Sequence, residues 1–158
     1  MSFKSFFSPL AVCILLQIFG CASSKQTTPV VRLATLEKST IAVGSGGGFS
    51  GLYTGYVITR SGDIYGWRNI TGNPDSLELK LHTSADSVNF FFRYLDEIGF
   101  GDIALHTSGN MNSSIVRTEG TAEHRIQWAL DGSISAPPEI STFNSLVNNF
   151  IRRRIPKQ

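Results

Sequence analysis

Cysteine is almost missing from this chain of 158 residues: it has only Cys13 and Cys21, and both lie near the N-terminus. The chain after Cys21 therefore has no thiol for a disulfide, a thiolate nucleophile or a sulfur-ligated metal. A domain without such cross-links depends on its apolar core for stability. The sequence supplies that core, because 41% of the residues are hydrophobic and 11 are Phe.

Charge is also scarce, since charged residues make up 16% of the chain and the formal net charge is +2. A chain so close to neutral does not attract nucleic acid in bulk, and we expect no nucleic-acid partner. The metalloprotease pattern H-E-x-x-H and the nucleophile elbow G-x-S-x-G are absent, and His82, His106 and His124 lack ligand-like spacing. The sequence thus predicts no catalytic residue, no metal site and no cofactor.

No apolar run is long enough to span a bilayer, which takes ~20 residues, and Leu10–Phe19 is about half of that. Lys4 before this run and Gly20 after it are typical of a secretory signal peptide. The segment Ile18–Cys21 resembles the lipobox of bacterial lipoproteins. The resemblance implies cleavage before Cys21, lipidation of its sulfur and anchoring in the lipid bilayer of a bacterial cell envelope.

The residues after Cys21 refine this expectation. Ala22 resembles lipoproteins sorted to the outer membrane, and the lack of an acidic run after Cys21 favours a periplasm-facing protein. Ala22–Pro29 is rich in Ser, Thr and Gln and is typical of a tether. We therefore expect a cleaved signal peptide at 1–20, a lipidated Cys and flexible tether at 21–39, and one globular domain at 40–158.

Alternating apolar residues predict antiparallel strands. The expected strands are Thr40–Val43, the hairpin Leu52–Arg60 and Asp63–Ile70, Leu77–Leu81, and the hairpin Ser113–Thr118 and Ala122–Leu130. A two-residue turn at Ser61-Gly62 would place Tyr56 opposite Trp67 and Ile58 opposite Tyr65, all on one face.

Two segments follow the helical period of 3.6 residues. Their apolar positions are Val88, Phe91, Phe92, Leu95 and Ile98 in the first, and Phe143, Leu146, Val147, Phe150 and Ile151 in the second. Thr83 and Ser84 are both candidate N-caps of the first helix, Gly99 is placed to end it, and Phe92 and Phe150 are expected in the core. The predicted fold class is α+β, with a largely antiparallel sheet and both amphipathic helices packed on one face. Arg152-Arg153-Arg154 complement the dipole of the second helix or bind a membrane surface or anionic partner.

The segment Gly44–Gly51 is the one unusual local motif. Gly46, Gly48 and Gly51 formally satisfy G-x-G-x-x-G, but a strand follows where a dinucleotide site needs a helix. Two interpretations remain: a bulged loop with Phe49 in the core, or a loop that offers its backbone to a partner. The run holds more glycine than one tight turn needs, which favours binding. The candidate partner-binding residues are Gly46, Gly47, Gly48, Phe49 and Gly51.

The segment Gly47-Gly48-Phe49-Ser50-Gly51, followed by strands, a Phe/Leu-rich helix, a hairpin and a terminal helix, resembles the emfourin family. That family has a Gly-Gly-Phe-Ala-Gly-type motif, and some members inhibit thermolysin-like metalloproteases. The resemblance implies a non-catalytic domain that binds an envelope protein, such as a protease. The alternatives are a structural or assembly lipoprotein of an envelope complex and, third, an enzyme of unrecognised type.

Overall fold

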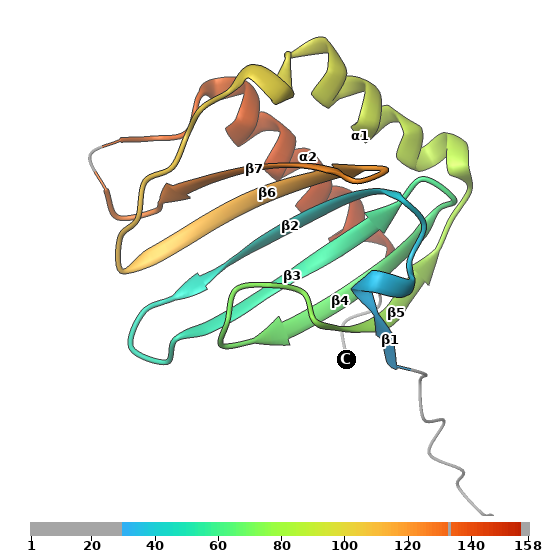
Figure 1. Cartoon of the computed structure of the whole chain (residues 1–158), viewed down its shortest axis with the longest axis horizontal. Coiled ribbons are helices and arrows are strands. Elements are labelled where there is room, and N and C mark those ends of the chain that lie inside the picture. The colour runs from blue at the N-terminus through green and yellow to red at the C-terminus, as the bar shows by residue number, and fades with distance from the viewer. Residues whose placement is uncertain (1–29, 133, 156–158) are drawn as a thin grey trace, which may run out of the picture.

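The computed structural model describes residues 30–132 and 134–155. In this part of the chain, seven antiparallel strands form one sheet in the order β1-β5-β4-β3-β2-β6-β7 (Figure 1). The strands are β1 (Val30–Arg32), β2 (Ser39–Gly47), β3 (Leu52–Thr59), β4 (Asp63–Asn69), β5 (Ser76–His82), β6 (Met111–Glu119) and β7 (Ala122–Ala129). The helices are α1 (Ala85–Glu97) and α2 (Pro138–Arg154), with 3₁₀ turns η1 (Leu33–Thr35) and η2 (Phe100–Asp102). The expected signal segment, Gly20, Cys21 and residues 22–29 lie outside the described residues.

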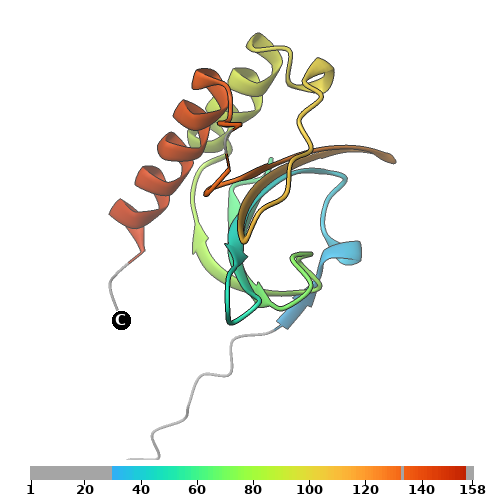
Figure 2. The same ribbon diagram turned by 90° about the vertical axis from the view of Figure 1, so that its left-hand side faces the viewer.

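Both helices pack on the same face of the sheet, and the α+β fold class is confirmed (Figure 2). α1 begins where the Oγ of Ser84 accepts a hydrogen bond from the N–H of Ser87. It ends before Gly99, whose φ of 63° is the left-handed conformation that glycine adopts without cost. The main core lies between this face and the helices. Its largest fully buried side chains include Phe91, Phe92, Phe143, Ile41, Ile58, Ile115 and Ile126.

Phe92 is buried as expected, whereas Phe150 lies only at the edge of the core. One side of the Phe150 ring is covered by the guanidinium of Arg154, 3.7 Å from its centroid. Phe91 meets the same ring edge to face, at 5.2 Å between centroids. Phe150 therefore joins the end of the helix to the core without being enclosed by it.

The sheet begins ten residues earlier than the sequence indicates, so the expected tether at 21–39 is too long. β1 pairs with β5 through Val31 opposite Leu77, and η1 follows at once. Val31 and Leu36 pack against a second apolar cluster on the opposite face of the sheet. Burial of these two side chains against the sheet stabilises the segment.

The register expected for the β3–β4 hairpin is wrong by one residue. Tyr56 pairs with Gly66 and Ile58 with Ile64, because the turn takes three residues rather than two. A shift of one residue sends alternate side chains to the other face. Tyr56 and Ile58 consequently face the helices, while Tyr65 and Trp67 belong to the second cluster on the far side.

The second cluster explains two glycines of the central strands. Trp67 lies over Gly44 and Gly55, which face each other in β2 and β3, and a Cβ at either position would overlap the indole ring. Burial raises the pKa of Tyr65 in the same cluster, and the nearby Asp63 carboxylate adds to that shift. The first glycine of the run is thus a strand residue that makes room for a tryptophan.

Candidate functional site

The candidate residues of the glycine run lie at the tip of the β2–β3 hairpin. Gly46 and Gly47 end β2, and the turn Gly48–Gly51 leads directly into β3. The turn closes with a hydrogen bond from the N–H of Gly51 to the carbonyl of Gly48, 3.1 Å from N to O. Phe49 is fully exposed on this turn, so the first of the two interpretations, a loop with Phe49 in the core, is wrong.

Each of these glycines has a structural reason, which corrects the idea that the run exceeds what the fold needs. Gly47, Gly48 and Gly51 have φ values of 106°, 66° and 61°. A Cβ on Gly46 would overlap the backbone of Leu52, and one on Gly47 would lie 2.5 Å from the carbonyl oxygen of Asn110. The glycines therefore build the tip, and its one large exposed side chain, Phe49, is left as the candidate contact residue.

Further apolar side chains are exposed at the same end of the sheet. Met111 opens β6 opposite Gly47, and the N–H of Leu130 donates to the carbonyl of Met111. The β4–β5 turn and the segment after β7 lie at this end as well (Figure 1). Five of the nine exposed large hydrophobic side chains of the described residues are found here. We call this set the tip surface: Phe49, Ile70, Met111, Leu130 and Ile134.

Polar side chains hold the loop that supports the tip. The amide of Asn112 accepts from the N–H of Gly109 at 2.9 Å and donates to its carbonyl at 3.0 Å. The Asp131 carboxylate accepts from the N–H of Asn110, whose carbonyl in turn accepts from Gly48 at 2.6 Å. The tip is therefore braced by the loops beside it and projects from a fixed base.

Sequence reasoning found Phe49 but missed the rest of the tip surface. Met111 follows the turn-forming residues Gly109 and Asn110, and a lone apolar residue in such a segment was the available signal. Ile70 and Leu130 gave no such signal, because they end the expected strands Asp63–Ile70 and Ala122–Leu130, where alternation predicts burial for Leu130. That the separate segments meet at one end depends on strand order.

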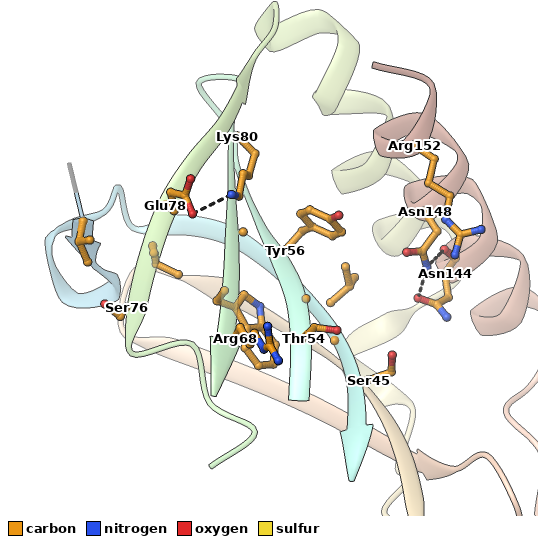
Figure 3. A pocket seen from close by; sticks show the side chains of 17 residues that line it. Ser45, Thr54, Tyr56, Arg68, Ser76, Glu78, Lys80, Asn144, Asn148 and Arg152 are labelled. Carbon is orange, nitrogen blue, oxygen red and sulfur yellow. Dashed lines mark hydrogen bonds and ion pairs between the residues drawn. The ribbon is translucent and has the colours of Figure 1, made fainter. Parts of the chain in front are cut away.

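A polar groove of about 600 Å³ lies between α2 and the strands β3, β4 and β5 (Figure 3). Asn144, Asn148 and Arg152 project from α2 toward it, and Tyr56 projects from the sheet. The charged lining residues are Arg68, Lys80, Arg152 and Glu78. The floor of the groove is made of small or polar residues such as Ser45, Thr54 and Gly66. These residues offer no apolar surface for α2 to pack against, and the groove stays open there.

The three histidines do not meet. His124 lies edge to face against Phe100, with Nε2 3.1 Å from the carbonyl oxygen of Ile103, and the ring nitrogen Nδ1 of His82 is 2.6 Å from Asp63. His106 bridges to Gln127 beside β7. Among residues 30–132 and 134–155, no group of three His, Cys, Asp or Glu residues could hold a metal ion.

Across the described segments, no helix is both long enough and apolar enough to cross a bilayer. No protein-family model matches the chain, and the comparison with curated proteins gives no match. The features of the molecule that bear on function are therefore the tip surface, the groove and the N-terminal sequence.

Proposed function

We propose that the chain is a membrane-anchored lipoprotein of a bacterial envelope whose domain binds a protein partner through the tip surface and performs no catalysis. The exposed Phe49 on its braced hairpin tip carries this proposal, with the four other exposed apolar side chains at the same end of the sheet. Clustered exposed apolar residues mark interaction sites more often than chance. Aromatic residues, phenylalanine among them, are enriched in the cores of protein interfaces.

A projecting hairpin with an aromatic residue at its apex suits a partner with a cleft. The turn has little backbone freedom to lose on binding, because Gly48 is bonded to Asn110 and Gly51 to Gly48. A protease cleft is one such partner surface, in keeping with the resemblance to the emfourin family. Envelope proteases are therefore the first partners to test.

The partner proposal is tested by replacing Phe49 with Ala in the full-length chain. Phe90→Ala is the matched control, because Phe90 is also an exposed phenylalanine but lies on α1. Capture of envelope proteins, quantified by mass spectrometry, is expected to lose a specific partner with F49A and to keep it with F90A. Inhibition of thermolysin by the unaltered chain, F49A and F90A tests whether the partner is a protease. Equal capture of envelope proteins by these three proteins would show that the tip surface does not bind the partner.

The anchor is tested separately, because it depends on the sequence Ile18–Cys21 and not on the domain. Cys21→Ser removes the sulfur that would carry the lipid. The variant is expected to leave the membrane fraction and to stop incorporating labelled fatty acid, while its domain melts as before. Continued labelling and membrane association would contradict the lipoprotein proposal. The proposal that the tip surface binds a partner would not be affected.

A further inference from the structure

We propose that the polar groove between α2 and strands β3–β5 binds an extended acidic peptide segment of a partner protein. This is a second binding surface, and it does not depend on the tip surface. The groove opens on the helix-covered face, at the part of the sheet that α2 leaves uncovered (Figure 3). Its occupant is identified by charge, by length and by the polar groups along its walls.

The groove carries unbalanced positive charge. Its only carboxylate among the lining residues, Glu78, is paired with Lys80 at 2.7 Å. In the described part of the chain, no ion pair involves Arg68 or Arg152. These two guanidinium groups are thus left to attract an anionic ligand, and arginine is well suited to carboxylates because it can donate two parallel hydrogen bonds.

The two unpaired cations come from opposite walls of the groove. Arg68 comes from β4 and Arg152 from the last turn of α2, on opposite sides of the groove (Figure 3). From Asn144 to Arg152 the wall of α2 is ~12 Å long, because a helix rises ~1.5 Å per residue. An extended peptide covers that length with about four residues. A segment with several carboxylates can pair with cations on both sides of the groove at once.

The wall between the cations is suited to a peptide backbone. The Asn148 amide nitrogen donates to the carbonyl and side-chain oxygens of Asn144, at 2.8 and 3.1 Å. This fixes the side chains and leaves the Asn148 oxygen and the Asn144 nitrogen to face a ligand. Asparagine offers both an acceptor and donors, which complement the N–H and C=O groups of an extended chain.

The alternative ligand is an anionic membrane surface. Substitution of Arg153 distinguishes binding to a membrane from binding to a peptide. Arg153 is exposed on the same turn as Arg152 but does not line the groove. A flat anionic bilayer attracts every exposed cation on that side, within the screening length of ~10 Å in 0.1 M salt. A peptide held in the groove uses Arg152 and leaves Arg153 in solvent. Arg153→Ser is therefore the matched control for Arg152→Ser.

The test measures binding of a fluorescein-labelled decapeptide of alternating Glu and Ser to the full-length chain by anisotropy at low ionic strength. R68S and R152S are each expected to weaken binding about threefold to fivefold, as for exposed ion pairs, and R153S to leave it unchanged. N148D, which puts a negative charge on the wall, is expected to weaken it at least as much. Melting curves exclude loss of folding, and a Gln-Ser decapeptide is the uncharged control.

Three results would overturn the proposal. The first is no binding of the acidic peptide by the unaltered chain, and the second is equal weakening by R152S and R153S. The third comes from vesicles of phosphatidylglycerol in phosphatidylcholine: vesicle binding that exceeds peptide binding and falls equally with both substitutions would assign these cations to a lipid surface.

Discussion

Strand β2 begins, and β3 and β6 end, at one end of the sheet (Figure 1). Charged side chains pair with one another at this end, whereas apolar side chains are exposed to solvent at the opposite end. We call the first the closed end. The Glu119 carboxylate there meets Arg60 at 2.9 Å and Arg117 at 3.1 Å, and accepts from the hydroxyl of Ser39 at 2.8 Å. Arg117 also contacts Asp96 of α1 at 2.5 Å.

We propose that the first end serves the fold and that the second serves a partner. At the closed end, Glu119 joins β6 to Ser39 of β2 and to Arg60 after β3, and Arg117 joins β6 to Asp96 of α1. The tip surface has only its backbone and its supporting loop satisfied, while its apolar side chains have no cover within the described residues. A monomer gains nothing from exposing them together, so we infer that their cover comes from outside the domain.

The largest effect is expected from breaking the packing beneath the closed end. Phe92 is fully buried in the main core, and the guanidinium of Arg60 lies 4.3 Å from its ring centroid. Phe92→Ala should lower the free energy of unfolding by ~3–5 kcal/mol, because it leaves a cavity and removes the surface under Arg60. Denaturant unfolding measures this directly. Phe90→Ala, on the exposed side of the same helix, should cost less than about 1 kcal/mol.

A smaller effect is expected from the glycines of the tip. Gly47→Ala should destabilise the domain by ~1–3 kcal/mol, because φ is 106° and the new Cβ would press on the Asn110 carbonyl. Gly51→Ala should cost less, since nothing lies within 4 Å of its added Cβ and only its φ of 61° opposes the change. Hydrogen exchange at Gly48 and Leu130 should accelerate mainly in G47A. Equal costs would mean that contact with Asn110 does not brace the tip.

The sequence predicts what is decided locally. The two helices follow from apolar residues at helical spacing, and the ends of α1 follow from Ser84 and Gly99. The fold class follows in turn, because two amphipathic helices and several alternating strands have few ways to bury their apolar faces. The hairpin of β6 and β7 is also local, since its turn residues lie between its strands.

Features that depend on contacts between segments far apart in the sequence could not be predicted in this way. The register of β3 and β4 depends on one extra residue in the turn between them. The position of β1 depends on its pairing with β5, which lies far along the chain. Gly44 is required because of Trp67, which is distant in sequence and close in space. The candidate site divides in the same way: Phe49 is visible within its glycine motif, but Leu130 joins it only through the order of the strands.

The smallest effect concerns the charge network of the closed end. Burial alone would raise the pKa of Glu119, but hydrogen bonds from Ser39, Arg117 and Arg60, together with the charge of Arg60, outweigh it and lower the pKa below the ordinary 4.5. A carboxyl whose pKa is lower in the folded state stabilises the fold above the unfolded pKa, and the contribution disappears as the pH falls through the folded pKa. The network should therefore stabilise the domain at neutral pH and lose that contribution in acid.

Glu119→Gln tests this sign. The variant should melt at a lower temperature than the unaltered chain at neutral pH, by a small margin because the side chain is 40% exposed. The difference should shrink as the pH is lowered past about 4.5, where the unfolded carboxyl becomes protonated. Glu97→Gln is the control, because Glu97 is an exposed carboxylate that makes no ion pair within the described residues. A melting difference for E119Q that stays constant from neutral to acid pH would show that Glu119 acts at the closed end through packing and not through its charge.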